Sequence, residues 1–168
     1  TLDGVSVVVD AGLSRRAEFD LAAGVTRLVT HRASRASADQ RAGRAARQGP
    51  GVAYRLWEEA AHPGRAAFDP PEIETSDLAG LVLALADWGA RDPAALAWLD
   101  PPPRASVEAA RARLMALGAL DPEGAITPFG KQVASRPMAP DEAAMALFGA
   151  RAGQALQAAR LALLLQER

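Results

Sequence analysis

Three arginines and one glutamine lie within a single short segment, Gln40–Arg47. Gln40, Arg44 and Arg47 follow the spacing i, i+4, i+7, which on a helix places them on one face. A guanidinium pairs bidentately with phosphate oxygens, and a glutamine can orient the water that attacks a phosphoryl group. The pattern therefore predicts a helix face for nucleotide hydrolysis, with Arg41 pointing elsewhere.

The charge distribution supports phosphate as the ligand. The net charge is only −1, but between residues 27 and 47 there are six arginines and a single acid, Asp39. Between residues 58 and 100 the balance is reversed, with nine acids against Arg65 and Arg91. A basic stretch is typical of nucleotide or nucleic-acid contacts. A solvated arginine face is the alternative, and the Gln40–Arg47 pattern disfavours it.

Composition excludes several classes of site. There are no cysteines, which excludes disulfides and thiolate metal sites. His31 and His62 are far apart in the sequence, so we expect no metal site in this chain. No apolar run has the length of a membrane span, and no signal peptide is visible, so we expect a cytoplasmic protein without membrane contacts.

Two segments imitate nucleotide-binding motifs. Residues 124–131 resemble a P-loop, but the spacing between the glycines is wrong and Gln132 replaces the hydroxyl residue. Residues 141–144 resemble an acidic box, but Pro140 and the acids after it are typical of a helix N-terminus. Both are interpreted as ordinary helix starts.

The elements that would position the arginines are those of an α/β domain. Residues 6–10 predict a buried strand, and residues 15–30 predict a β-hairpin that turns at Gly24. Ser34 or Ser37 would cap a helix running to about Gln48, with Asp39 in its first turn. A strand over 52–57 follows, and residues 58–69 form a linker or short helix. The sheet should expose an unpaired edge.

The remainder predicts a helical unit with a wing, followed by more helices. Asp77, Ser106 and Thr127 would each cap a helix. Trp88, Trp98 and Leu99 are predicted to be core residues, whereas Arg111 and Arg113 are predicted to be solvated. The predicted elements are helices over 78–88, 93–99, 107–117 and 129–135, a turn at 121–124 between two short strands, and helices over 141–150 and 153–166.

These motifs resemble a known family. Residues 40–47 resemble motif VI of the superfamily 2 helicases of the DEAH/RNA-helicase A type, Gln-Arg-x-Gly-Arg-x-Gly-Arg, with Ala46 in place of a glycine. Residues 1–5 and 7–12 resemble motif V. Residues 72–73, Leu78, 99–103 and 117–121 resemble the winged-helix domain that follows in this family. The bacterial HrpB-type branch is the most similar.

The resemblance implies a role for each motif residue. Gln40, Arg44 and Arg47 would act in ATP hydrolysis, and Asp3 and Gly43 would contribute to nucleotide binding. Thr1, Arg16 and Arg35 would contact the nucleic-acid backbone. ATP and Mg²⁺ are implied as cofactors, with most of their ligands upstream of this chain. The implied partners are RNA, with DNA as the alternative, and upstream RecA-like domains of the same chain.

The predicted organisation is an α/β remnant followed by mainly α units. Residues 1–69 would be the C-terminal part of a second RecA-like domain, residues 70–137 a winged-helix domain, and residues 138–168 the start of a ratchet-like helical bundle. Because the chain begins inside a motif and lacks a P-loop, we expect a helicase segment that is inactive by itself. The alternatives are a non-catalytic winged-helix module that binds nucleic acid or protein, and a structural helical scaffold.

Overall fold

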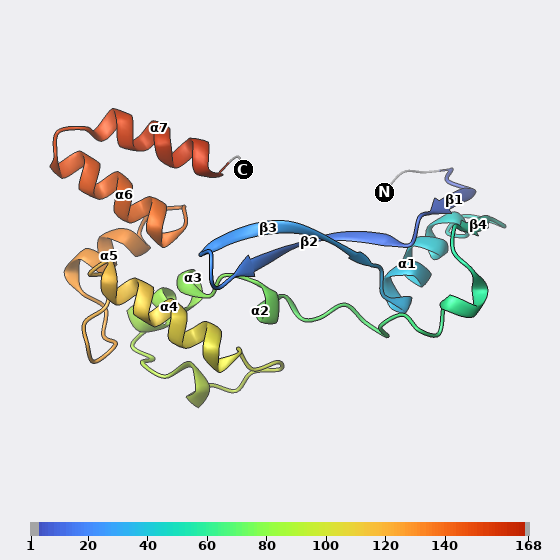
Figure 1. Ribbon diagram of the computed structural model, residues 1–168, viewed down its shortest axis with the longest axis horizontal. Helices are drawn as coiled ribbons and strands as arrows, with labels where there is room; N and C mark the ends of the chain where they lie inside the picture. Colours follow the sequence, from blue (N-terminus) through green and yellow to red (C-terminus); the bar gives the residue numbers. More distant parts are fainter. Residues whose placement is uncertain (1–3, 167–168) are drawn as a thin grey trace. The chain divides into compact units, whose positions relative to one another are not determined.

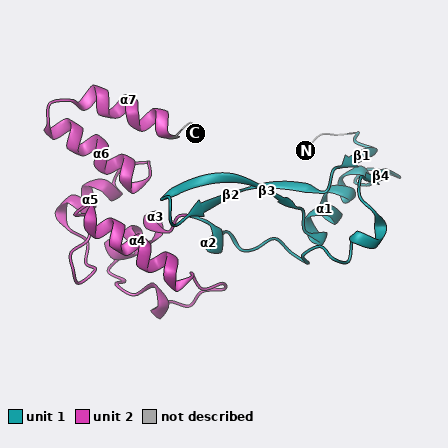
Figure 2. Cartoon of the chain, in the orientation of Figure 1, with its two compact units in different colours: residues 1–76 teal, residues 77–168 magenta. Residues whose placement is uncertain are grey.

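The computed structural model describes residues 4–166. The chain divides into two compact units, Thr1–Ser76 and Asp77–Arg168, which Figure 2 distinguishes by colour. The division follows Ser76 rather than residue 69, and residues 138–168 share a unit with the preceding helices. The division into three domains therefore stays a prediction. None of the described helices is long and apolar enough to cross a membrane.

The first unit contains a two-stranded parallel sheet. Strand β1 (Val7–Asp10) pairs with β4 (Val52–Arg55), and helix α1 (Arg35–Ala45) contacts both strands. Burial alternates along β1, as expected when one face is covered: Asp10 is buried, whereas Val7 and Val9 are exposed. The prediction of a buried strand was therefore wrong in this chain, because only one face of β1 is covered.

The predicted β-hairpin is confirmed. Strands β2 (Leu13–Asp20) and β3 (Val25–Arg32) pair antiparallel along their whole length, and Figure 1 shows them extending away from β1, β4 and α1. Gly24 closes the turn with a φ of +65°. The backbone amides of Ala23 and Ala22 donate to the Asp20 carboxylate, and chiefly the first of these bonds lowers the pKa of Asp20.

Helix α1 begins as predicted and ends early. Ser34 is its N-cap, and its hydroxyl accepts a hydrogen bond from the Ser37 amide at 3.1 Å. The helix ends at Ala45 and not near Gln48, and Asp39 lies beyond the first turn. A Cβ at Gly51 would collide with the Ala45 carbonyl group. The chain thus passes directly against the end of α1 to enter β4, which leaves no room for another turn.

The other elements of the first unit are short. Strand β4 ends at Arg55, two residues before the predicted end at Trp57. A 3₁₀ turn η1 (Glu59–Ala61) and helix α2 (Glu72–Thr75) follow. Helix α2 contacts β2 of the hairpin.

The second unit consists of helices around a small wing. The helices are α3 (Ala79–Trp88), the 3₁₀ turn η2 (Pro93–Ala95), α4 (Arg104–Ala116), α5 (Pro128–Ala134), α6 (Pro140–Arg151) and α7 (Ala155–Gln166). The wing is a single antiparallel bridge between Leu120 and Ile126. Buried aliphatic side chains of α3, α4 and α5 form the core, with Leu114 fully buried. Helix, helix, wing, helix is the predicted order.

One of the three predicted caps, Thr127, is confirmed as the N-cap of its helix, whereas the N-cap of α3 is Leu78 and Asp77 lies one residue before it. The Asp77 carboxylate accepts from the Ala79 amide at 2.9 Å, and the Thr127 hydroxyl accepts from the Gly130 amide at 2.9 Å. Ser106 is not a cap, because α4 already begins at Arg104, directly after the proline run. The helix over 93–99 is reduced to the three residues of η2.

Two residues predicted for the core are on the surface. Trp88 is 77% exposed and Leu99 is 97% exposed. Trp88 is the last residue of α3, and Leu99 lies in the loop before α4, so neither is covered by the core helices. Trp98 is half-buried, and its indole N–H donates to the Pro93 carbonyl at 2.7 Å.

Arg113 is not a solvated residue, because it joins three helices. Its guanidinium contacts the carboxylates of Asp77 and Asp141, the latter at 3.2 Å from Nε. Asp77 precedes α3, Arg113 lies in the last turns of α4, and Asp141 lies in the first turn of α6. Burial is the main reason that the pKa of Asp141 is raised.

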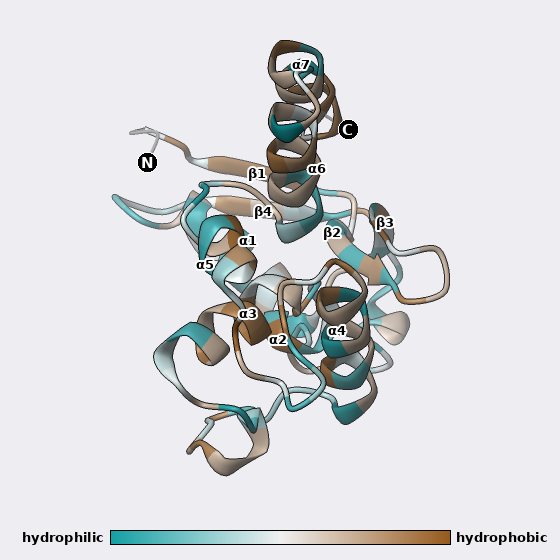
Figure 3. Cartoon of the chain, turned by 90° about the vertical axis from the view of Figure 1, so that its left-hand side faces the viewer, coloured by the Kyte–Doolittle hydropathy of each residue, from teal (hydrophilic) through white to brown (hydrophobic). Residues whose placement is uncertain are grey.

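Helices α6 and α7 form an antiparallel pair, and α7 carries several exposed leucines. A Cβ at Gly149 would overlap the Ala158 side chain, so this glycine permits the close approach of the two helices. Figure 3 shows α7 as predominantly apolar. Its exposed leucines are Leu156, Leu161, Leu163, Leu164 and Leu165.

Candidate functional site

The N-terminal end of β1 and the C-terminal end of α1 lie together. The Gly4 amide donates to Gln48 Oε1 at 3.0 Å, and the Val52 amide donates to the Ser6 carbonyl at 2.9 Å. The segment that resembles motif V therefore meets the end of the segment that resembles motif VI. Thr1 and Asp3 lie outside the described residues.

The predicted cationic face is only partly helical. Gln40 and Arg44 lie one turn apart on α1, and both are exposed, as is Gly43. Arg47 lies beyond the C-cap residue Ala46, so it extends the motif from a turn and not from the helix. The prediction that Arg47 shares the helix face of Gln40 and Arg44 was wrong, because α1 ends at Ala45, where Gly51 passes close to it.

Arg44 is available for a ligand. Within residues 4–166, the structure gives its guanidinium no carboxylate partner. An exposed, uncompensated guanidinium is suited to phosphate, and the Gln40 amide one turn earlier provides a polar group beside it.

Arg41 has a different environment from Arg44. Its Nε donates to Asp10 Oδ2 at 3.0 Å, its Nη2 lies 3.0 Å from Asp10 Oδ1, and its Nη1 donates to the Leu13 carbonyl at 3.1 Å. The Gly12 amide donates to the same carboxylate at 2.8 Å. The buried Asp10 thus ties the end of β1 to α1. Sequence reasoning missed this pair, although a single acid at the end of a valine run was a usable signal.

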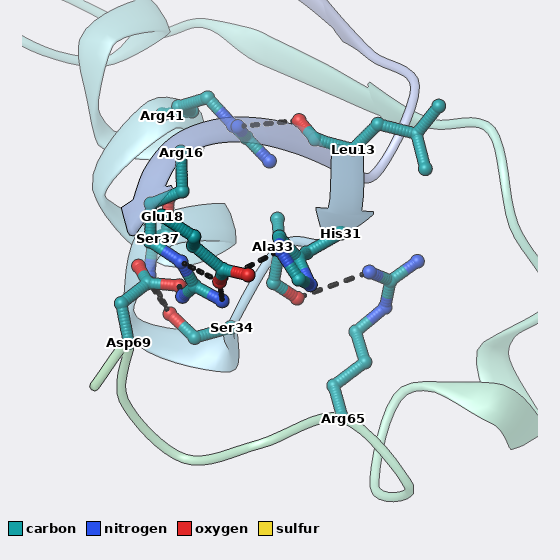
Figure 4. A network of polar contacts seen from close by, with 10 residues as sticks. All are labelled: Leu13, Arg16, Glu18, His31, Ala33, Ser34, Ser37, Arg41, Arg65 and Asp69. Atoms are coloured by element: carbon teal, nitrogen blue, oxygen red, sulfur yellow. Dashed lines mark hydrogen bonds and ion pairs between the residues drawn. The ribbon is translucent and has the colours of Figure 1, made fainter. Parts of the chain in front are cut away.

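A polar network holds the middle of the hairpin to the start of α1 (Figure 4). Arg16 contacts Glu18 at 3.3 Å and Asp69 at 3.4 Å. Asp69 accepts from the Ser34 hydroxyl at 3.0 Å, and His31 lies 2.9 Å from Glu18. The Arg16 charge is therefore paired inside this unit.

Arg35 is an exposed residue at the start of α1. Its backbone amide donates to the Ala66 carbonyl at 2.8 Å. Its side chain is free to project from this end of α1, so contacts of Arg35 and Arg16 with nucleic acid stay predictions.

The root of the hairpin is fastened separately. Arg65 Nη1 donates to the carbonyls of Gly12 and Ala33, at 2.8 and 3.1 Å. Its guanidinium lies 4.1 Å from the centre of the Trp57 ring. Gly12 has a φ of +71°, and a Cβ there would lie 2.6 Å from Trp57 Cε3. Only glycine fits this position without displacing the tryptophan.

The residues present fit part of an ATP site. Arg44 can neutralise phosphate charge, and Gln40 can orient a water molecule. The described residues contain no cluster of acidic or histidine side chains that could hold a metal ion.

These features define an arginine-bearing α/β unit joined to a winged-helix unit, and comparison with known proteins agrees. Residues 110–135 match the family "Helicase associated domain (HA2), winged-helix". The chain is 41% identical over 167 residues to the ATP-dependent RNA helicase HrpB of Escherichia coli, covering 99% of this chain and 20% of that protein. It is 41% identical over 141 residues to the splicing factor ATP-dependent RNA helicase prp22 of Schizosaccharomyces pombe, covering 83% of this chain and 12% of that protein.

Solved structures show the same relationship. A crystal structure of the E. coli DEAH/RHA helicase HrpB superimposes with a TM-score of 0.91 at 41% identity, covering 99% of this chain and 21% of that one. The chain is homologous to a segment of the DEAH-type ATP-dependent RNA helicases, and the resemblance found in its motifs is confirmed. It spans about one fifth of the length of HrpB.

Proposed function

We propose that this chain acts as part of an ATP-dependent RNA helicase and supplies the arginine motif of its ATP site. The observation that carries the proposal is the exposed Arg44 beside Gln40, in a chain homologous to proteins named ATP-dependent RNA helicases. The contact between Gly4 and Gln48 supports it, because it joins the two motif segments at one end of the sheet.

Each motif residue has a proposed role. Arg44 and Arg47 stabilise the negative charge that gathers on the γ-phosphate, and Gln40 orients the attacking water. Asp3 and Gly43 contribute to nucleotide binding, and Thr1, Arg16 and Arg35 to the nucleic-acid backbone. ATP and Mg²⁺ are the proposed cofactors, bound together with other RecA-like domains of the same protein. RNA is the proposed substrate, and a cytoplasmic location stays a prediction.

The winged-helix unit has a structural role in this proposal. Arg113, one of two arginines that could have formed a recognition surface on α4, is occupied by Asp77 and Asp141. This observation favours a structural, supporting role for the winged-helix unit over a role as an independent nucleic-acid-binding module.

The test is single-turnover ATP hydrolysis by the full-length protein. Arg44→Ala should slow turnover by about 10³-fold, the scale known for arginine fingers, and Arg44→Lys should rescue it only in part, since a point charge lacks the planar fork. Arg91→Ala, an exposed arginine in the second unit, is the matched control. Near-normal turnover by Arg44→Ala would show that the motif has another role.

A further inference from the structure

A hollow beside the hairpin root lies apart from the arginine motif. It has a volume of about 460 Å³ and is lined by Arg55, Trp57, Glu59, His62 and Pro63. Arg55 is the last residue of β4 and the other lining residues follow it, whereas the contact between Gly4 and Gln48 lies at the opposite end of the parallel pair. The hollow contains none of the motif residues proposed for the ATP site.

The walls of the hollow are suited to a flat ring. The rings of Trp57 and His62 are nearly parallel, with an interplanar angle of 16° and centroids 6.1 Å apart. Arg65 covers part of the Trp57 ring at 4.1 Å but does not line the hollow. Trp57 is half-buried and presents part of its side chain to the hollow.

Trp57 is fixed before any ligand arrives. The close approach of Gly12 and the stacked Arg65 guanidinium hold the indole against the hairpin root. A rigid aromatic surface loses little conformational entropy on binding, and every nucleobase has a face that can stack on it.

Polar groups around the rings match the edge of a base and its phosphate. The exposed Glu59 carboxylate can accept a hydrogen bond from an amino group of a base. The Arg55 guanidinium lies 5.8 Å from the Trp57 ring centre. Its ion pair with the exposed Asp39 is accessible to an exchanging phosphate.

We propose that this hollow is a stacking subsite for one unpaired nucleobase of single-stranded RNA, with Trp57 as the platform. The proposal rests on the proposed function, because it presumes that the full-length protein binds RNA. Its distinguishing feature is affinity that depends on the base and not only on the phosphate backbone. A free mononucleotide carries the same base and phosphate as one residue of RNA, so the test includes a separate measurement with a mononucleotide.

The experiment measures binding of a fluorescein-labelled 12-nucleotide adenosine RNA to the full-length protein by fluorescence anisotropy. Trp57→Leu should weaken binding by about tenfold, within the range for loss of one stacking aromatic, and Trp57→Phe should restore most of it. The slope of log Kd against log salt concentration should not change, because no phosphate contact is lost. His62→Ala, which keeps Trp57 and its contacts with Gly12 and Arg65, should also weaken binding, because it removes the second ring of the hollow.

Three controls make the result decisive. Trp88→Leu removes an exposed tryptophan from the second unit and should not affect affinity. An abasic oligomer of the same length should bind wild type and Trp57→Leu equally. AMP alone should show no Trp57-dependent binding in calorimetry, and thermal unfolding checks the fold of each variant.

The outcomes separate the two proposals. If wild type binds RNA and Trp57→Leu and His62→Ala bind it equally well, the subsite is overturned and the proposed function stands. An equal loss with the abasic oligomer, or Trp57-dependent binding of AMP without an effect on RNA, would also overturn it. If wild type binds no RNA, both proposals fail.

Discussion

Arg41 and Arg44 lie one turn apart on α1 and have opposite surroundings. Arg41 forms a bidentate pair with the buried Asp10, whereas Arg44 is exposed and has no carboxylate partner within the described residues. A single arginine motif therefore divides into a side chain that holds the helix to the sheet and a side chain that is available for phosphate.

Arg41→Ala should destabilise the protein far more than Arg44→Ala does. Removing one partner of a buried ion pair costs up to about 3–5 kcal/mol, and the partial exposure of Arg41 reduces the expected loss to about 2 kcal/mol. Arg44→Ala should change stability by less than about 0.5 kcal/mol. Urea unfolding of the full-length variants, with hydrogen exchange at residues 10–13 as the local measurement, checks this. Equal stability of the two variants would contradict the proposed division.

Sequence reasoning found Gln40 and Arg44 because their spacing is local. It did not identify the partner of Arg41: Asp10 stands out as an acid at the end of a valine run, but only the packing of α1 on β1 brings it to Arg41. The ion pairs of Arg113 were missed for the same reason, because Asp77 and Asp141 lie far from it in the sequence, before α3 and in α6. Long-range ion pairs are invisible to periodicity.

At the scale of elements, the hairpin β2–β3 makes the clearest functional prediction. We expect it to wedge between nucleic-acid strands. It extends away from β1, β4 and α1, and in the sequence it lies between the segments that resemble motifs V and VI. Replacing residues 15–30 with a short Gly/Ser linker in the full-length protein should reduce unwinding more than ATP hydrolysis. Duplex-unwinding and ATPase assays on the same preparation check this, and unchanged unwinding would reject the wedge role.

The junction of α3, α4 and α6 should respond to pH through Asp141. Burial raises the pKa of this carboxyl group above 3.8, despite the neighbouring Arg113. A raised folded-state pKa means that the stabilising contribution is fully present below the unfolded pKa and is lost as pH rises through the folded value. Asp141→Asn should therefore leave stability at pH 7 unchanged or higher.

Asp77→Ala is the contrasting variant for this junction. It removes the hydrogen bond that the Ala79 amide donates at the start of α3 as well as an ion pair, and loss of a side-chain acceptor at a helix start costs about 1 kcal/mol. Thermal unfolding of the full-length variants at pH 4 and pH 7 distinguishes them. A lower melting temperature for Asp141→Asn at pH 7 would contradict the sign.

Helices and strands were predicted correctly where neighbouring residues in the sequence determine a turn or a helix start. They were predicted poorly where contacts between distant segments determine a helix end or the burial of a side chain. The Ala-Gly turn correctly predicted the hairpin, and the Thr127 cap correctly predicted the start of α5. The end of α1 depends on the passage of Gly51 against Ala45, which no local pattern reveals. Trp88 and Leu99 were placed in the core by hydrophobicity alone, which does not show which helices cover them.

At the scale of the whole molecule, this chain should not hydrolyse ATP by itself. Its sequence has no intact P-loop, and residues 4–166 hold no cluster of metal-binding side chains. The purified 168-residue chain should therefore show no turnover above buffer in a phosphate-release assay. Turnover that disappears in the Arg44→Ala variant would contradict this prediction.

The order of units followed from the sequence because motif order is itself a sequence property. The α/β elements precede the helices and the wing, as predicted, and the similarity to HrpB supports this mixed fold. The two compact units divide after Ser76, next to Asp77, whose carboxylate contacts Arg113 and accepts from the Ala79 amide.

The fastened root of the hairpin has a mechanical consequence. Arg65 secures both strands at Gly12 and Ala33, so the hairpin can transmit a torque and not merely swing. Each strand has eight residues, which at about 3.4 Å per residue gives an arm of about 24 Å, and a rotation of about 10° at the root would displace the tip by about 4 Å. A small rigid-body rotation of this unit would thus be amplified at the tip to roughly the rise of one base step.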